Sequence, residues 1–288
     1  MRSVNEVQKE RICKMAVTYR EVRVETGGFM RVCIFPVRPV ANARKKKNKP
    51  TAATQERMNR INAARKLSDI INLNFTKSDV QLKLDYSAFR SEHGRNPDSV
   101  EVTRIMGNFL RRLKRAYLKK GIELKYVYCT EQGTRGHLTH HHAIISAGLS
   151  LDEIRSLWRD GGVWMRKLYF DERGCFDLAG YFVKAKYTYR SYTSSRNCVR
   201  PQESGRDKCI YKNDYRINQK TFSRITGNDA AAIRRLYPDW ELAELPNLQQ
   251  IIDYDTGEVQ DPMISPFLCL WFYKPWAVSD KNEKWRND

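Results

Sequence analysis

The strongest pattern along the chain is a helical repeat of apolar residues between residues 98 and 121. Apolar side chains recur there at steps of three and four residues: Val102, Ile105, Met106, Phe109, Leu110, Leu113 and Tyr117. This spacing is typical of a helix that buries one face. Asp98 or Ser99 is the expected N-cap, and Gly121 marks the expected end of the helix.

Apolar and alternating segments predict strands on both sides of this helix. Residues 80–84, 122–130, 138–145 and 163–170 have the composition of strands, and a polar turn joins the second to the third. Two shorter helices are expected, one opened by a capping box of Ser150 and Glu153 and one capped by Asp177. This order predicts an α+β fold, with a central antiparallel sheet and helices packed against one face.

The two ends of the chain differ from this central region. Residues 29–37 predict a strand, residues 43–50 form a basic run that includes Lys45, Lys46 and Lys47, and a helix is expected after Pro50. Later residues predict a helix at 229–236, a hairpin around 255–257 and an aromatic edge at 267–276. We therefore divide the sequence into a basic N-terminal extension (1–75), a core (76–201) and a C-terminal extension (202–288).

The charge balance indicates a polyanionic partner. Lys and Arg number 52 against 33 Asp and Glu, which gives a net charge of +19. This excess favours nucleic acid. The alternatives are a solvated basic surface or an anionic membrane, but no basic amphipathic helix with a lipid-facing aromatic side stands out. No apolar run approaches the about 18 residues that span a bilayer.

The cysteines bear on the compartment. All seven are widely scattered, and none forms a C-x-x-C pair. Such usage predicts a reducing environment, and the N-terminal residues lack the apolar core of a signal peptide. We expect a cytoplasmic protein.

Four of the five histidines lie in the segment HLTHHH (137–142). Alternate side chains of a strand point to opposite faces, so His140 and His142 share one face, while His137 and His141 point the other way. Two imidazoles placed like this can chelate one divalent ion and leave room for another ligand, water and substrate. The alternative is a polar strand that binds no metal.

Glu131 is the candidate third ligand. It ends the strand that is expected to pair with the histidine strand, and it reaches the metal if the turn brings it to the same face. A carboxylate beside two imidazoles favours Mn²⁺ or Mg²⁺. The alternative for Glu131 is a solvated turn residue.

Tyr181 is the candidate nucleophile, and Lys184 lies three residues further along the same helical face. A phenol beside a cation suits attack on a phosphodiester, which leaves a covalent phosphotyrosine and a free sugar hydroxyl. Lys184 would lower the pKa of the phenol, hold the phosphate or orient the cleaved end. Against this, a tyrosine on an amphipathic helix is more often part of the core.

Cations and tyrosines alternate in the following segment, KAKYTYRSYTSSR (184–196). Such a mixture suits single-stranded DNA, because cations follow the backbone and rings stack on unpaired bases. An edge strand with polar decoration is the alternative. The candidate DNA contacts in and beside this segment are Lys186, Tyr187, Arg190, Arg196 and Asn197.

The order of these motifs resembles that of the HUH endonucleases, and more narrowly the replication-associated proteins of bacterial phages, plasmids and mobile elements. These are single-tyrosine initiators of rolling-circle replication. The resemblance rests on Glu131 followed by HHHAII (140–145), GLSLDE (148–153), LAGYFVK (178–184), SRN (195–197) and Pro201. It extends from about residue 45, through NLNF (72–75), to the region of residues 236–238.

The resemblance implies an RRM-like antiparallel sheet and a role for each matched residue. His140 and His142 would hold the metal with Glu131, Tyr181 would be the nucleophile, and Lys184 its partner. The chain departs from the family in two places. A strand that often carries Leu-Thr-Tyr reads LDY (84–86), and position 185, where a two-tyrosine initiator would place a second nucleophile, is alanine.

We therefore expect a metal-dependent nickase that opens and rejoins an origin stem-loop in a bacterial host cell. No G-x-x-x-x-G-K phosphate loop is present, so unwinding and synthesis would need a host helicase and polymerase. A relaxase or transposase would use the same chemistry. A non-enzymatic nucleic-acid-binding regulator is the alternative from another class.

Overall fold

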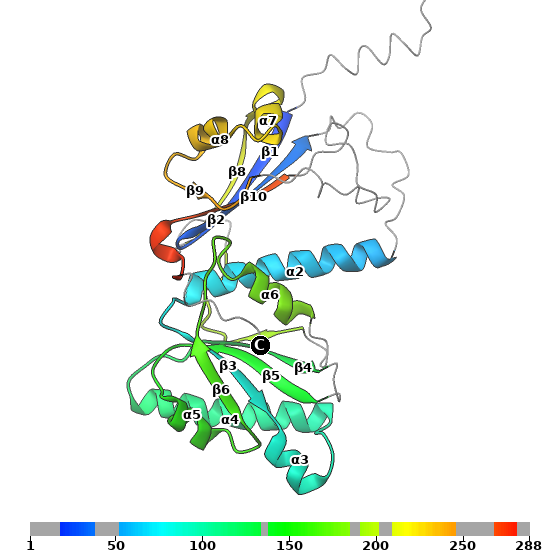
Figure 1. Ribbon diagram of the computed structural model, residues 1–288, viewed down its shortest axis with the longest axis vertical. Coiled ribbons are helices and arrows are strands. Elements are labelled where there is room, and N and C mark those ends of the chain that lie inside the picture. Colours follow the sequence, from blue (N-terminus) through cyan, green and yellow to red (C-terminus); the bar gives the residue numbers. More distant parts are fainter. Residues whose placement is uncertain are drawn as a thin grey trace, which may run out of the picture. The chain divides into compact units, whose positions relative to one another are not determined.

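A computed structural model describes residues 18–37, 52–133, 138–184, 191–201, 209–245 and 268–280. The chain divides into two compact units. The first contains Met1–Met58 and Pro201–Pro275, and the second contains Asn59–Arg200 and Trp276–Asp288. Each unit has its own five-stranded antiparallel sheet, so the fold is α+β with helices beside the sheets (Figure 1).

The second unit contains the residues on which the predicted site depends. Its sheet has the strand order β6-β3-β5-β4-β7, and all of its ladders are antiparallel. Its elements are α2 (Ala52–Asn74, which begins in the first unit), β3 (Val80–Asp85), α3 (Ser87–His93), α4 (Ser99–Lys119), β4 (Tyr126–Gln132), β5 (Thr139–Ile145), α5 (Leu151–Leu157), β6 (Val163–Lys167), α6 (Phe176–Lys184) and β7 (Thr193–Ser194).

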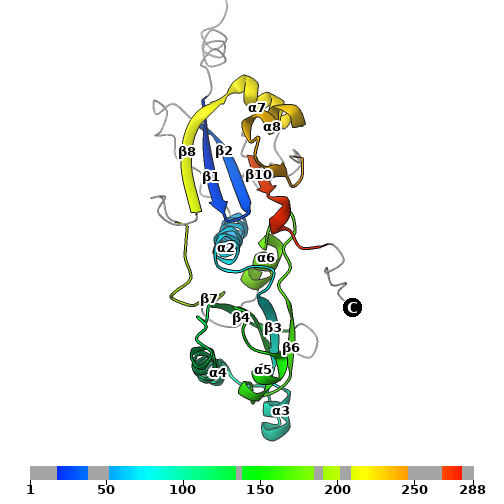
Figure 2. The same ribbon diagram turned by 90° about the vertical axis from the view of Figure 1, so that its left-hand side faces the viewer.

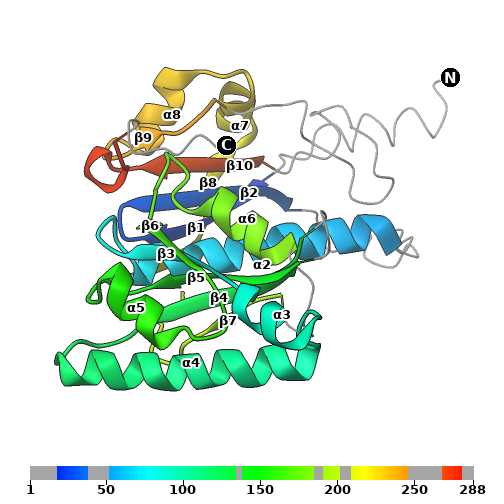
Figure 3. The same cartoon turned by 60° about the horizontal axis from the view of Figure 1, so that its bottom comes forward.

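The helical repeat predicted from the sequence forms α4, and its apolar face covers one face of this sheet (Figure 3). Six of the seven predicted positions are buried: Val102, Ile105, Met106, Phe109, Leu113 and Tyr117. They join one core cluster with Leu82, Leu84, Ala143 and Ile145 of the sheet. Full burial of one such side chain stabilises the fold by about 1.5–3 kcal/mol, so this interface holds the sheet against α4.

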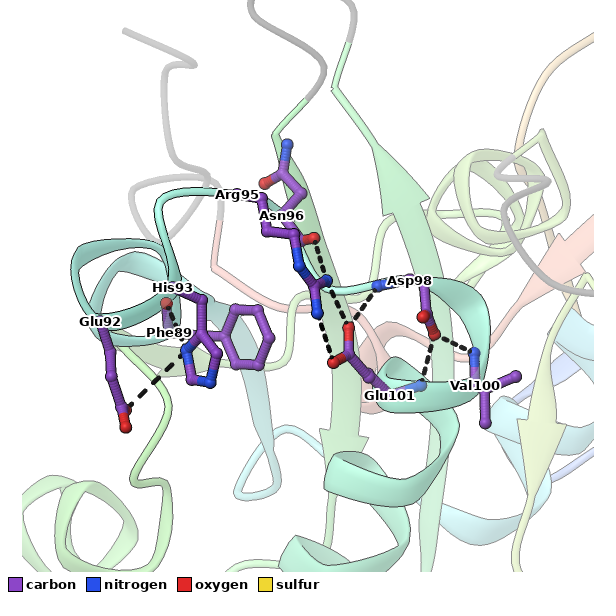
Figure 4. Close-up of polar contacts among 8 residues, drawn as sticks. All are labelled: Phe89, Glu92, His93, Arg95, Asn96, Asp98, Val100 and Glu101. Atoms are coloured by element: carbon purple, nitrogen blue, oxygen red, sulfur yellow. Dashed lines mark hydrogen bonds and ion pairs between the residues drawn. The ribbon is translucent and has the colours of Figure 1, made fainter.

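The start of α4 is fixed by a capping box (Figure 4). The Asp98 carboxylate accepts from the backbone N–H groups of Val100 and Glu101, each at 2.8 Å, and the Glu101 carboxylate accepts from the Asp98 N–H at 2.9 Å. Arg95 donates two further bonds to Glu101, at 2.7 and 2.8 Å, and these lower the pKa of Glu101 to about 2. The predicted Asp98 cap is confirmed, and so is the Ser150–Glu153 box of α5.

Three predicted boundaries were wrong. Strand β4 begins at Tyr126 instead of residue 122, because the preceding backbone is bound to the α4 terminus and to Asn197. Strand β6 ends at Lys167, since Leu168 turns away to bond the Asp79 carbonyl. Asp177 does not cap α6 but lies in its first turn, where it accepts from Arg173 at 2.7 Å.

Helices lie on both faces of this sheet. The sequence predicted helices against one face, and α4 and α5 pack there. Helix α6 lies on the opposite face, where Phe182 contacts His142 with ring centroids 6.3 Å apart. The α6 face is the one that carries the candidate site.

The first unit joins strands from both ends of the chain in one sheet of order β8-β1-β2-β10-β9, with two helices beside it (Figure 2). Its elements are β1 (Thr18–Thr26), β2 (Phe29–Val37), β8 (Cys209–Asn218), α7 (Gln219–Thr226), α8 (Ala230–Leu236), β9 (Glu241–Leu242) and β10 (Leu268–Tyr273); the short 3-10 helix Pro275–Ala277 follows. The predicted strand at 29–37 and helix at 229–236 are confirmed as β2 and α8. The predicted basic run at 43–50 and hairpin at 255–257 lie outside the described residues.

No helix in the described part of the chain is long and apolar enough to cross a membrane. The predicted division at residues 75/76 and 201/202 remains a sequence-based prediction.

Candidate functional site

The ladder between β4 and β5 brings the three predicted metal ligands together. Glu131 is the direct cross-strand partner of His140, and Cys129 is the partner of His142. Directly opposed residues project from the same face of a sheet, so Glu131, His140 and His142 share the α6 face. The turn that joins the strands is closed by a bond from the Gly133 N–H to the Leu138 carbonyl, at 3.0 Å.

The ligand atoms of this triad converge on one point. The Nε2 atoms of His140 and His142 are 3.0 Å apart, and each lies 3.4 Å from Oε2 of Glu131. One nitrogen or oxygen from each residue can be chosen so that all three atoms lie within 4.8 Å of one another. Two imidazole nitrogens and one carboxylate oxygen at such spacing match the ligand set of a divalent cation.

The hydrogen bonds of His140 support this fit. Its Nδ1 lies 3.1 Å from the Leu138 carbonyl, which can only accept, so Nδ1 carries the proton. The lone pair of the neutral ring is then on Nε2, which faces the triad. A carbonyl bond of this kind fixes the tautomer that a metal ligand needs.

His142 is a buried residue, and its protonation state follows from that burial. Burial lowers its pKa to about 3, and His140 and Lys83 lower it further through their charges. Its Nδ1 is buried and has no hydrogen-bond partner among the described residues. A neutral ring at ordinary pH keeps a lone pair available for a cation.

His141 lies between the two candidate ligands and points to the opposite face, as strand parity predicts. It is fully buried, with Nε2 2.6 Å from the Tyr86 hydroxyl and Nδ1 3.0 Å from Thr130 Oγ1. Burial lowers its pKa to about 3. His137, the other histidine predicted to face away, lies outside the described residues.

Tyr181 reaches the triad from α6. Ala179, Phe182 and Val183 are the buried residues of this helix, whereas Tyr181 is 42% exposed. Its hydroxyl donates to Glu131 Oε2 and lies 3.2 Å from His142 Nε2. The phenol ring meets the His142 ring edge to face, with centroids 5.0 Å apart. The proposed nucleophile is thus within hydrogen-bond distance of two candidate metal ligands.

The state of the phenol follows from these contacts. Burial and the hydrogen bond to Glu131 raise the pKa of Tyr181 above its usual value of 10.0, and the charge of Glu131 adds to the shift. The hydroxyl is therefore protonated at neutral pH in this arrangement. A cation held by the triad would act in the opposite direction, because it favours the phenolate.

The other predicted site residues are not brought to the triad by the described contacts. Lys184 is the exposed last residue of α6. Arg196 is exposed, and the Asn197 amide donates to Glu123 Oε1 and to the Leu124 carbonyl, at 2.9 and 3.0 Å. The remaining predicted DNA contacts lie outside the described residues: Lys45, Lys46, Lys47, Lys186, Tyr187 and Arg190. All of these assignments remain predictions.

The departure at Asp85 has a structural explanation. Its carboxylate accepts from the N–H groups of Gly162 and Ser87 and from the Ser87 hydroxyl, at 2.7, 2.8 and 2.8 Å. Burial alone would raise the pKa of Asp85, but these hydrogen bonds lower it overall. Asp85 therefore joins the end of β3 to the start of α3 and to the chain before β6. The following residue, Tyr86, supports His141, a role that the sequence pattern did not indicate.

Comparison with known proteins locates a family relationship in this same region. Residues 84–188 match the model of a family of replication-associated proteins, the ORF2 family. The matched segment includes the triad, Tyr181, Lys184 and the Tyr86 support of His141. Neither the curated proteins nor the solved structures that were compared give a match. The segment that contains the candidate metal site thus carries the sequence signature of replication-associated proteins.

Proposed function

We propose that the protein is a metal-dependent endonuclease and strand transferase that nicks single-stranded DNA at an origin and so initiates rolling-circle replication. The observation that carries this proposal is the position of the Tyr181 hydroxyl, 3.2 Å from Nε2 of a histidine in the candidate metal triad. The replication-associated signature of residues 84–188 supports the same function.

Each residue of the site has a defined part in this chemistry. His140, His142 and Glu131 would hold a divalent ion, Mn²⁺ or Mg²⁺. When bound, the ion would neutralise charge on the scissile phosphodiester. Tyr181 Oη attacks phosphorus, the new O–P bond forms as the bond to the 3′ oxygen breaks, and that oxygen leaves with the electron pair. The phenol loses its proton, the 3′ oxygen gains one, and the 5′ phosphate remains on Tyr181.

The reverse reaction rejoins the strand. A 3′ hydroxyl attacks the phosphotyrosine, and Tyr181 leaves as the phenol. A single nucleophile is consistent with Ala185, which offers no second hydroxyl on α6. Lys184 would act on the phosphate or on the cleaved end. Origin stem-loop recognition and the host helicase and polymerase belong to this proposal as partners.

The test is trapping of the covalent intermediate. The purified chain is incubated with Mn²⁺ and single-stranded oligonucleotides that tile the DNA flanking its gene, and the products are separated under denaturing conditions. We expect a protein–DNA adduct that EDTA prevents and that Tyr181→Phe abolishes, because the phenyl ring has no attacking oxygen. Mass spectrometry should find the nucleotide on the peptide that contains Tyr181.

Tyr273→Phe is the matched control, since Tyr273 lies in the other sheet and its substitution should leave the adduct intact. An adduct that persists in Tyr181→Phe would remove Tyr181 as the nucleophile. If no tiled oligonucleotide forms an adduct, yet the chain binds them tightly, the result would favour a nucleic-acid-binding regulator. A relaxase or transposase would form the same adduct, and its target DNA would distinguish it.

A further inference from the structure

The sheet face that carries the metal triad also carries a strip of cationic and aromatic side chains that the proposed chemistry does not use. Lys83 on β3 is the cross-strand partner of His142 on one side and of Trp164 on the other. Directly paired residues project from the same face, so the three side chains form a row across β5, β3 and β6. Trp164 lies two strand spacings from His142, which is roughly 10 Å.

Trp164 is unusual among the aromatic residues of this unit because it is 55% exposed. Its ring is held on one side by the backbone of Gly162, where an added Cβ would lie 2.9 Å from a ring carbon. The Lys83 ammonium lies 5.8 Å from the ring centroid, within the range of a cation–π contact. A large ring is thus presented at the surface beside an exposed cation.

The charges next to this ring are positive and not neutralised by acids. Among the described residues, Lys83 makes no ion pair. Arg166, two residues after Trp164 on the same face of β6, donates to the amide oxygen of Gln81 at 2.9 and 3.1 Å. Because that acceptor is neutral, Arg166 is positioned without losing its charge. The row therefore combines one exposed ring with two positive charges, beside the triad.

We propose that Trp164, Lys83 and Arg166 form a binding subsite for a nucleotide next to the phosphodiester that is cut. The unpaired base would stack on the Trp164 ring, and the cations would contact the backbone phosphates. Stacking on an exposed ring requires a base outside a duplex, so the subsite takes single-stranded DNA. The inference rests on the proposed function for the identity of the group bound at the triad.

The first test measures binding without cleavage. The full chain is titrated into fluorescently labelled oligo(dT) in EDTA, and anisotropy gives the Kd. Trp164→Ala should weaken binding by about 5- to 150-fold, which is the range for loss of one stacked base. Trp164→Phe should retain most of the affinity. Trp276→Ala is the control, because Trp276 is 68% exposed in the same unit but belongs to the 3-10 helix Pro275–Ala277.

An abasic scan tests whether the ring contacts a base. In wild type, removing the base at one position should weaken binding, and in Trp164→Ala the same removal should cost nothing further. Loss of affinity that is equal at every position in both proteins would overturn the stacking role. Thermal unfolding of each variant confirms that the protein remains folded.

The cationic part of the subsite has its own measurement. Lys83→Gln should reduce the slope of log K against log salt by about 1, because one phosphate contact is lost. Lys167→Gln is the matched control: Lys167 is an exposed residue of β6 that pairs with Val80 and points to the other face. An unchanged slope in Lys83→Gln would remove this residue from the subsite.

Failure of the subsite and failure of the proposed chemistry give different results. If wild type forms no adduct but Trp164→Ala still loses oligo(dT) affinity, the subsite holds and the chemistry at Tyr181 fails. If the adduct forms normally and oligo(dT) binding is the same in Trp164→Ala as in wild type, the subsite is wrong and the chemistry holds.

Discussion

His141 shows how one buried side chain can fix the direction of its neighbours. Both of its ring nitrogens are used, one by Tyr86 and one by Thr130, on the face that packs against α4. Because side chains alternate along β5, holding His141 on that face directs His140 and His142 to the other. A neutral, doubly bonded imidazole is therefore part of what positions the candidate metal ligands.

The pKa of His141 predicts a pH dependence of stability. In the unfolded chain a histidine binds a proton near pH 6.5, whereas in the folded protein the pKa of His141 is about 3. The unfolded state thus binds more protons between these values, so the contribution is complete above pH 6.5 and is lost as the pH falls toward 3. From pH 6.5 to 5 the loss from this group is about 2 kcal/mol.

Urea unfolding in EDTA at several pH values measures this effect. His142, whose pKa is also lowered to about 3, adds a loss of the same sign in wild type. We expect His141→Gln to be less stable at pH 7 but to lose about 2 kcal/mol less than wild type between pH 6.5 and 5. Equal losses in the two proteins would show that His141 is not kept neutral by the fold.

Sequence reasoning reached the metal triad because strand parity is a local rule. It separated His140 and His142 from His141, and the structure places Glu131 on their face. It did not find Tyr86 or Thr130 as supports of His141. Those contacts depend on which strands become neighbours and on complete burial, and neither can be derived from spacing along one segment.

Among the elements, those with strong local signals were predicted best. The apolar repeat and cap of α4, the capping box of α5 and the Asp229 cap of α8 all depend on residues a few positions apart. The ends of β4 and β6 were wrong because tertiary hydrogen bonds set them. Strand β1 was not predicted, and its buried Glu21, bonded by Tyr237 at 2.8 Å, interrupts the apolar alternation expected of a strand.

The connection from α5 to β6 makes a further prediction possible. A Cβ at Gly161 would lie 2.3 Å from Asp85 Oδ1 and 2.4 Å from the Asp85 carbonyl oxygen, so backbone would have to move. We expect Gly161→Ala to lower the free energy of unfolding by about 1–3 kcal/mol, a typical cost of overpacking. Chemical denaturation of the purified variant measures the change.

Gly107→Ala is the matched control for this substitution. Gly107 lies within α4, and a Cβ there meets nothing within 4 Å. Alanine is favoured over glycine inside a helix by about 0.5–1 kcal/mol, so this variant should be more stable than wild type. If Gly161→Ala were as stable as Gly107→Ala, the close approach of Asp85 to Gly161 would not limit the fold.

Over the whole chain, local patterns could not show which strands share a sheet. Strand β1 pairs with β2 across a two-residue turn, in which Gly27 adopts φ 64°, but it also pairs with β8, from Cys209 to Asn218. Strand β2 pairs in turn with β10. These ladders join residues almost 200 positions apart, and no periodicity within either segment encodes the pairing.

The division into two units predicts where a bound cation should stabilise the protein. The triad of Glu131, His140 and His142 lies entirely in the second unit, and each unit has its own sheet and core cluster. A ligand that binds only the folded site stabilises it by about 2.7 kcal/mol at 100 times its Kd. Saturating Mn²⁺ should therefore slow amide hydrogen exchange in β4 and β5 more than in β1 and β2.

Hydrogen-exchange mass spectrometry with and without Mn²⁺ gives this comparison peptide by peptide. Glu131→Ala should remove most of the protection, since even an outer-shell partner of a metal contributes about 10–100-fold in affinity and Glu131 is a candidate direct ligand. Equal protection of both sheets would mean that the units open together rather than separately. Protection that survives in Glu131→Ala but disappears when His140 and His142 are both replaced by alanine would restrict the metal site to the two histidines, and Glu131 would then act on Tyr181 alone.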